Sequence, residues 1–126
     1  MSRDNSATVL AARLKALADE TRLQMLALLS EHRELCVCDF EHVLGISQSK
    51  ASRHLRYLYH ARLVDERRQG VWIYYRLADN LEPALRAVIK NTREALDPEL
   101  LADLNKRLEE WIASESCNPR CFRMTS

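Results

Sequence analysis

The sequence predicts a mostly α-helical protein with one β-hairpin. Apolar residues recur at helical spacing before residue 60 and again after residue 80. Between these regions the segment RLVDERRQGVWIYYRL alternates apolar and polar residues on both sides of a glycine, which is typical of two strands joined by a tight turn. The chain has only two glycines, Gly45 and Gly70, and each stands where the chain is expected to reverse.

Length and composition indicate one soluble globular domain. The chain has 126 residues, of which 47% are apolar and 29% charged, enough for one hydrophobic core but hardly for two. Met1 to Ser6 is polar and has no signal-peptide pattern, and no apolar run approaches the roughly 18 residues of a membrane span. We therefore expect a cytoplasmic protein without a membrane partner, in which thiols stay reduced.

Three helices are expected before residue 46. The first carries leucines at i, i+4 and i+7, and Asp19 is a good N-cap for the second. The third is short, and Gly45 ends it because a left-handed C-cap suits glycine. The apolar residues expected on these helices are Leu10, Leu14, Leu17, Leu23, Leu26, Leu28 or Leu29, Val37, Phe40, Val43 and Leu44.

The fourth helix is expected to run from about Gln48 to Tyr59, with Ser47 as its N-cap. Its apolar face, Ala51, Leu55 and Leu58, meets the core. The opposite face has hydroxyls and amides first, then guanidinium groups, and no carboxylate: Gln48, Ser49, Ser52, Arg53 and Arg56. Two strands follow, and the turn between them is expected at Gln69-Gly70.

Two longer helices are expected to close the chain. The first opens near Asn80, with Pro83 tolerated in its first turn. The second has Asp97 as its N-cap and Pro98 at its first position, where the missing N–H is not needed.

The order of these elements describes a winged helix-turn-helix: a helix, a glycine-containing turn, a polar-faced helix and a basic hairpin. The major groove of DNA admits one α-helix, and Arg, Gln, Asn and Ser or Thr read base edges there. Charge supports this interpretation, because residues 47–76 hold seven Lys/Arg and two acids, a net +5, whereas residues 79–115 sum to −4. The candidate DNA-contacting residues are Ser47, Gln48, Ser49, Lys50, Ser52, Arg53, His54, Arg56, Arg67 and Arg68.

Two cysteines, Cys36 and Cys38, stand one residue apart in the segment ELCVCDF, just before the third helix. In a cytosolic protein such a pair binds metal or senses redox state more often than it staples a fold. Residues i and i+2 of a helix point about 200° apart, so one ion is expected to reach both thiols only if the first turn of that helix unwinds. The remaining cysteines, Cys117 and Cys121, flank Asn-Pro-Arg, which suits a turn that brings them together.

Three segments, LKALADETRLQMLALL, ELCVCDF and SQSKASRHLRYLYHARLVDERRQGVWIYYRL, resemble the ArsR/SmtB family of bacterial metal-responsive repressors. The resemblance covers about residues 8–96, and ELCVCD is similar to the arsenic-responsive branch. It implies a homodimer that binds an imperfect inverted repeat over the promoter of its own resistance operon and leaves the DNA when an inducer binds. Residues 1–126 are then expected to form a single winged-helix domain with a family-like core (8–96), an extra C-terminal helix (97–115) and a cysteine-containing tail (116–126).

The resemblance also implies As(III), or similarly Sb(III), as the inducer bound by Cys36 and Cys38, and no organic cofactor. Soft trivalent arsenic prefers thiolates. The commonest pattern of the branch has a third cysteine shortly after the aspartate, where this chain has Phe40 and Glu41. Cys117 and Cys121 are therefore the remaining candidate metal ligands.

Two other functions were weighed against this one. A thiol-based redox repressor would use a disulfide in place of the metal. A small thiol enzyme would need a phosphate-cradling loop or a C-x-x-C motif on a βαβ unit, and neither is present, so we expect no enzymatic activity. The zinc site of related repressors uses histidine on the helix after the hairpin, and no histidine follows His60.

Overall fold

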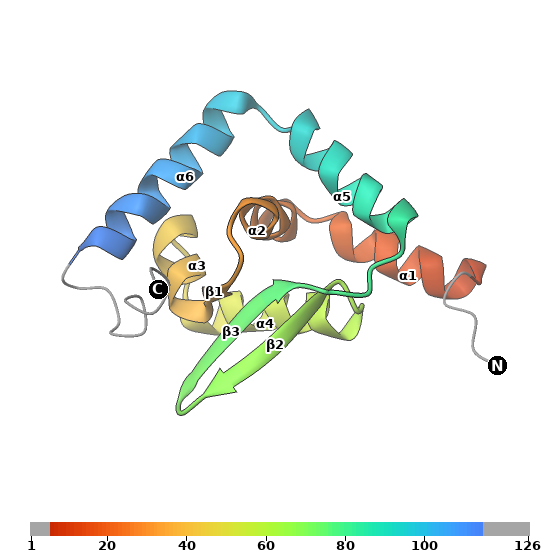
Figure 1. Cartoon of the computed structure of the whole chain (residues 1–126), viewed down its shortest axis with the longest axis horizontal. Coiled ribbons are helices and arrows are strands. Elements are labelled where there is room, and N and C mark those ends of the chain that lie inside the picture. Colours follow the sequence, from red (N-terminus) through yellow and green to blue (C-terminus); the bar gives the residue numbers. More distant parts are fainter. Residues whose placement is uncertain (1–5, 115–126) are drawn as a thin grey trace.

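Six helices and three short strands make up residues 6–114, the part of the chain that the computed structural model describes. Figure 1 shows the hairpin β2–β3 projecting from the helical body, and α5 and α6 forming an arch above α2. The prediction of a mostly α-helical winged helix-turn-helix is confirmed. The elements in chain order are α1 (Ala7–Leu17), α2 (Glu20–Glu31), β1 (Leu35–Cys36), α3 (Val37–Leu44), α4 (Gln48–His60), β2 (Val64–Gln69), β3 (Trp72–Leu77), α5 (Pro83–Ala95) and α6 (Pro98–Ala113).

Most of the expected helix ends are confirmed by their capping contacts. The side chain of Asp19 accepts a hydrogen bond from the N–H of Arg22, and Ser47 accepts one from Lys50. Gly45 has a φ of 65°, the left-handed conformation expected after α3. These residues fix the lengths of α2, α3 and α4, and so place the turn that separates α3 from α4.

The start of α5 differs from the expectation. The helix begins at Pro83, three residues later than Asn80, and Leu81 is buried ahead of it. The residue before a proline avoids the α conformation because of a clash with the proline ring, and Glu82 is extended with a ψ of 147°. At the start of α6 no such conflict arises, and Asp97 and Pro98 take their expected positions.

The three strands form one antiparallel sheet in the order β1-β3-β2. Strand β1 is not predicted by the sequence, which places the two cysteines just before the third helix. Leu35 and Cys36 pair with Tyr75 and Tyr74 of β3. The thiol segment is therefore an edge strand of the same sheet that forms the wing.

The turn of the hairpin lies one residue later than expected. Gln69 pairs with Trp72, so the two turn residues are Gly70 and Val71 rather than Gln69 and Gly70. Gly70 has a φ of 63°, and a two-residue turn with glycine first is one of the tight turns that match the twist of antiparallel strands. Val71 is consequently exposed at the tip.

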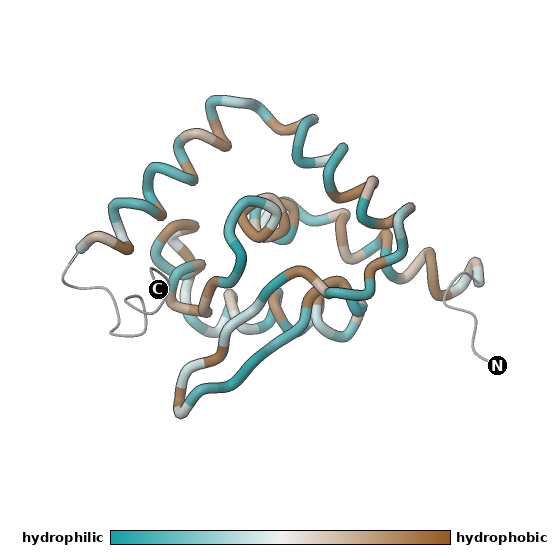
Figure 2. Tube along the Cα trace, viewed as in Figure 1, coloured by the Kyte–Doolittle hydropathy of each residue, from teal (hydrophilic) through white to brown (hydrophobic). Residues whose placement is uncertain are grey.

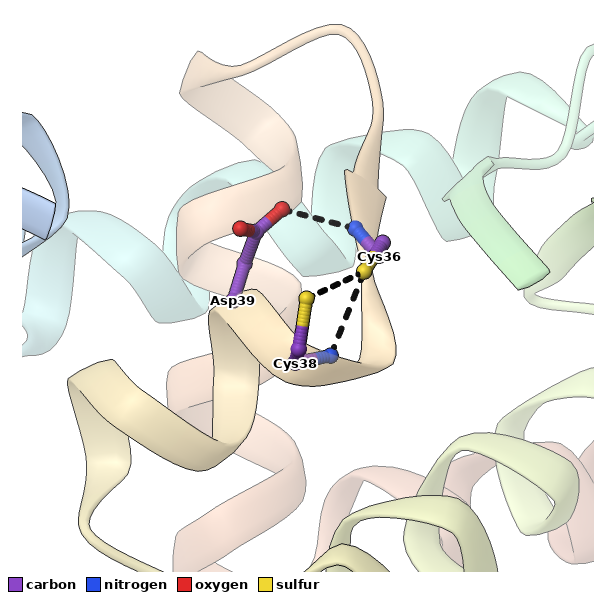
Figure 3. A group of neighbouring side chains, drawn as sticks. All are labelled: Cys36, Cys38 and Asp39. Atoms are coloured by element: carbon purple, nitrogen blue, oxygen red, sulfur yellow. Dashed lines mark hydrogen bonds between the residues drawn. The ribbon is translucent and has the colours of Figure 1, made fainter. Parts of the chain in front are cut away.

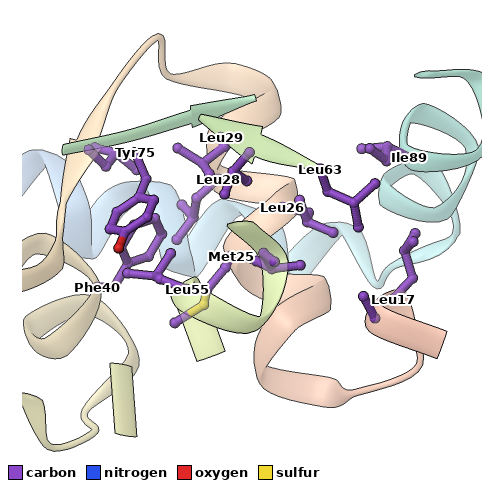
Figure 4. Close-up of a cluster of buried hydrophobic side chains, with 14 of the residues drawn as sticks. Leu17, Met25, Leu26, Leu28, Leu29, Phe40, Leu55, Leu63, Tyr75 and Ile89 are labelled. Atoms are coloured by element: carbon purple, nitrogen blue, oxygen red, sulfur yellow. The ribbon is translucent and has the colours of Figure 1, made fainter. Parts of the chain in front are cut away.

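Helix α2 lies at the centre of the core. Five consecutive residues of this helix, Met25 to Leu29, are buried, because α1, α4, α5, α6 and β3 all pack around it. Both Leu28 and Leu29 are therefore inside, where the sequence left the choice open. Figure 4 shows Leu28 and Leu29 between Phe40 and Tyr75 on one side and Leu63 and Ile89 on the other. In Figure 2 the trace of α2 is largely hydrophobic, whereas that of β2 is hydrophilic.

Helix α1 uses a different inner face from the one its leucines suggested. Leu10 and Leu14 are 37% and 41% exposed, whereas Arg13 is buried. One nitrogen of Arg13, Nη1, donates to both carboxylate oxygens of Glu82, while Nε and Nη2 donate to the carbonyls of Ala61 and Arg62. These partners satisfy the guanidinium inside the fold. Of the three leucines of α1, Leu17 is buried, and Leu10 and Leu14 remain on the surface.

Candidate thiol site and DNA interface

Cys36 and Cys38 converge at the N-terminal end of α3 (Figure 3). Cys36 is the N-cap of the helix, with φ −99° and ψ 166°, and its sulfur accepts a hydrogen bond from the Cys38 N–H at 3.2 Å. The two Sγ atoms are 2.8 Å apart, and neither cysteine is in a disulfide. Cys36 is buried and Cys38 half-buried, so the pair is open to a small ligand from one side.

The expectation that α3 must unwind to bring both thiols together is wrong. Two side chains at i and i+2 point about 200° apart only when both residues are helical, but Cys36 lies before the first turn, in β1. Its extended backbone directs the sulfur back over the helix end, toward Cys38. The two thiols are thus already positioned side by side in an intact structure.

Asp39 locks this arrangement. One oxygen of its carboxylate accepts a hydrogen bond from the Cys36 N–H at 2.8 Å, which completes a reciprocal capping box with cysteine as the cap. The other oxygen accepts one from Trp111 Nε1 at 2.9 Å. A carboxylate oxygen of Asp39 and the two sulfurs lie within 4.8 Å of one another, a grouping of metal-ligand type within residues 6–114. Sequence reasoning did not single out Asp39, although its position three residues after a cap is the spacing of a capping box.

Helix α6 closes over α3 beside the thiols. The Trp111 ring stacks on His42, with centroids 3.9 Å apart and planes at 19°. Nearer the middle of α6, Arg107 donates to the Val43 carbonyl at 2.7 Å. The last turns of α6 are therefore fixed against α3, and the chain continues from there to Cys117 and Cys121, which lie outside the described residues.

Helix α4 presents the polar face expected of a recognition helix. Its exposed residues include Ser47, Gln48, Ser49, Lys50, Arg53 and Arg56, with Ser52 half-buried among them. Its first turn holds no acidic residue, and Gln48, Ser49 and Lys50 of that turn are exposed. A helix end of this kind favours the phosphates of DNA.

His54 points the other way. Its Nδ1 is 3.1 Å from Arg22 Nη1, and since arginine only donates, Nδ1 is the acceptor and the ring proton sits on Nε2. Burial lowers the pKa of His54, and the neighbouring cations, first of them Arg22, lower it further, while Asp19 partly offsets them. This half-buried side chain joins α4 to α2, and nothing in its placement supports the predicted contact with DNA.

The two arginines of the wing differ in their surroundings. Arg67 donates to both carboxylate oxygens of Glu34, at 2.9 and 2.8 Å, and lies 4.4 Å from the centre of the Tyr74 ring. The hydrogen bonds to Glu34 are the main cause that raises the pKa of Arg67. Arg68, next along the strand, is exposed. Sequence reasoning treated the two as equivalent, because nothing local distinguishes them.

Comparisons with known proteins agree with this architecture. The family model described as "Bacterial regulatory protein, arsR family" matches residues 19–66. The arsenic resistance transcriptional regulator ArsR1 of Pseudomonas putida is 39% identical over 105 residues, which cover 79% of this chain and 82% of the relative. The chain belongs to the ArsR family. The arsenical resistance operon repressor of Escherichia coli is 52% identical over 75 residues, 60% of this chain and 63% of that protein.

Two solved structures superpose on most of this chain. HlyU from Vibrio cholerae superposes with a TM-score of 0.63 at 30% identity, covering 74% of this chain and 97% of HlyU. The homodimeric winged helix-turn-helix DNA-binding domain Mb0332 from Mycobacterium bovis gives 0.60 at 30% identity, with 75% and 87% covered. This ArsR-family chain is accordingly a DNA-binding transcriptional regulator and not an enzyme. Within residues 6–114, no helix combines the length and apolarity needed to cross a membrane.

Proposed function

We propose that this regulator represses an arsenical resistance operon and leaves its operator when As(III) binds to Cys36 and Cys38. The observation that carries the proposal is the convergence of the two sulfurs, 2.8 Å apart, at the start of the helix that precedes the recognition helix. The relatives from P. putida and E. coli are arsenic resistance regulators by name, which supports the same role here.

The chemistry of the site favours a soft, thiophilic ion. Thiolates bind As(III) and Sb(III) in preference to hard cations, which require several oxygen ligands. The only carboxylate in the described group, Asp39, already accepts hydrogen bonds from Cys36 and Trp111. The Cys38 N–H donates to the Cys36 sulfur at the N-terminal end of α3, where the helix dipole favours negative charge on a thiolate ligand.

We propose that a third thiolate comes from Cys117 or Cys121. Trp111 is fixed beside Asp39 and α6 ends at Ala113, so the four residues from there to Cys117 can add about 14 Å of extended chain in which to return to the pair. X-ray absorption on the arsenite-loaded protein should then count three sulfurs, falling to two in the Cys117→Ser/Cys121→Ser double variant. Three sulfurs in that variant would exclude the tail.

The proposed DNA contacts are those of the exposed α4 face and the wing: Ser47, Gln48, Ser49, Lys50, Ser52, Arg53, Arg56, Arg67 and Arg68. His54 is left out because it faces α2. The exposed apolar residues Leu10, Leu14 and Val88 support a homodimer that pairs through α1 and α5. Such a dimer would place two recognition helices in major grooves one turn or a multiple apart, on an imperfect inverted repeat.

We propose that all 126 residues act as one domain in the cytoplasm, where thiols are kept reduced. The 8–96 core carries the DNA-binding elements, the helix expected at 97–115 braces α3, and the 116–126 tail supplies a ligand. Ligation at the α3 N-terminus reaches α4 through the turn at Gly45. Because coupling is reciprocal, operator DNA must weaken arsenite binding by the factor by which arsenite weakens DNA binding.

The short distance between the sulfurs also favours a second candidate, a redox repressor that forms a Cys36–Cys38 disulfide. One experiment decides between them: fluorescence anisotropy on a labelled duplex carrying the promoter of the operon that encodes the chain. Arsenite should release the protein under full reduction if the metalloid is the inducer. Release by peroxide without arsenite, and none by arsenite, would support the redox switch instead.

A further inference from the structure

The thiol site and the wing share one sheet. Cys36 of β1 pairs with Tyr74 of β3, and Tyr74 pairs on its other side with Arg67 of β2. These three residues therefore occupy one row across the strands, and residues in such a row project to the same face. A sensor cysteine and a wing arginine thus stand two strands apart with one aromatic ring between them.

An ion pair between Glu34 and Arg67 also connects the cysteine segment to the wing. Glu34 precedes Cys36 by two residues, so it shares the face of Cys36 along the strand direction. Its carboxylate receives two hydrogen bonds from Arg67, whose third nitrogen donates to Gln69 at 2.8 Å. The Glu34 side chain is only 17% exposed, compared with 42% for Arg67. The guanidinium is held on the Tyr74 ring by a largely covered carboxylate that belongs to the thiol segment.

We propose that Glu34 and Arg67 are positioning residues that carry the state of the thiol site to the wing. This inference rests on the proposed function and adds a second path beside the one through Gly45 and α4. Strand β1 pairs with β3 through only two residues. Few backbone hydrogen bonds therefore hold this edge strand, and binding of an ion to Cys36 can shift it. Glu34 moves with the edge, and Arg67 moves with Glu34, because its guanidinium nitrogens are committed to that carboxylate and to Gln69.

The Glu34–Arg67 ion pair is suited to this role because its removal should change the stability of the fold only slightly. Partly exposed ion pairs contribute little net stability, since water and salt compensate for their removal. Glu34→Gln breaks the pair but leaves Arg67 available to DNA, so this variant should fold, bind arsenite and bind DNA. What it should lose is part of the coupling between the two ligands, a quantity that a purely structural residue would not change selectively.

The test compares Glu34→Gln with the wild type in the promoter-duplex assay, with and without arsenite under reducing conditions. Wild-type coupling is expected to be about 100-fold in operator affinity, within the usual range for such systems, and Glu34→Gln should reduce it to about 10-fold or less. Arsenite affinity of the free protein should stay within about two-fold. Asp79→Asn is the matched control, because it removes one carboxylate from an ion pair at the far end of the same sheet, with Arg76.

Three further measurements make the result decisive. Arg67→Gln should reduce coupling by a similar factor, and the double variant should lose no more than either single one, as expected for two residues of one contact. Glu34→Asp should recover part of the coupling. Wild-type coupling in Glu34→Gln, additive losses in the double variant, or arsenite binding lost with Glu34 would each overturn the inference. If arsenite fails to release the wild type at all, it is the proposed function that fails.

Discussion

Helices α3 and α4 begin in the same way and serve opposite purposes. Each has a side chain at its N-cap that accepts a hydrogen bond from the first turn: Cys36 for α3 and Ser47 for α4. At α3 the end is enclosed, because Asp39 returns a hydrogen bond to the cap and Trp111 covers the carboxylate. At α4 the end is exposed, and its first turn has no acid.

This difference shows how the same capped helix N-terminus can favour a thiophilic ion in α3 and a phosphate in α4. An N-terminal helix end attracts negative charge. In α3 that charge is supplied from within by the Asp39 carboxylate, and the two sulfurs beside it are ligands for a thiophilic cation. In α4 nothing internal supplies it, so the end remains available to DNA phosphates.

Removing the thiols should have the largest effect. Cys36→Ser and Cys38→Ser should retain operator affinity but lose release by arsenite, a change of about 100-fold in coupling. Serine is itself a good N-cap, so Cys36→Ser should keep α3 folded. The variant therefore removes the sulfur ligand without removing the helix cap. Anisotropy titrations with the promoter duplex measure both quantities. A Cys36→Ser/Cys38→Ser protein that arsenite still releases would move the sensor to Cys117 and Cys121.

The exposed face of α4 should come next. Arg53→Ala is expected to cost about 1–3 kcal/mol of operator binding and to relax specificity at one base position. Arg68→Ala should instead weaken binding to all sequences and lower the slope of log affinity against log salt by about 1. Competition with mutated duplexes at several salt concentrations separates the two. A change of sequence preference in Arg68→Ala would show that the wing reads bases.

Local rules predicted the starts of α2, α4 and α6 and the end of α3 because Asp19, Ser47, Pro98 and Gly45 act within a few residues of themselves. The thiol pair was likewise visible in ELCVCDF. Strand β1 was missed because it is two residues long and its partner lies about forty residues further along the chain.

The contacts that define the site are of the same long-range kind. Trp111 reaches Asp39 across 72 residues, and Arg67 reaches Glu34 across 33. The burial of Arg13 depends on Glu82, 69 residues away. The sequence therefore identified the candidate ligands and the DNA-facing helix, whereas the groups that hold them in place became visible only in the folded chain.

Opening the enclosed end of α3 should have a smaller effect than removing its thiols. Trp111→Phe keeps an aromatic ring to stack on His42 but deletes the N–H that donates to Asp39, and should lower the free energy of unfolding by about 1 kcal/mol. Urea unfolding followed by circular dichroism measures this loss. Trp111→Phe should also weaken arsenite binding, since α6 then holds the tail less firmly. Unchanged stability would mean that Asp39 is held well enough by Cys36 alone.

The smallest expected effect concerns the inner face of α4, where His54 meets Arg22. Burial and the nearby cations lower the pKa of His54 below its usual value near 6.5. As the pH falls through 6.5, the unfolded chain therefore takes up a proton that the folded chain resists, so folding stability declines until the pH passes below the folded pKa. His54→Gln should lose less stability between pH 7.5 and about pH 5 than the wild type does, as measured by urea unfolding at each pH. His60→Gln is the matched control, because His60 lies on the same helix and is exposed. An equal pH dependence in all three proteins would place His54 in a solvated position and return it to the outer, DNA-facing side of α4.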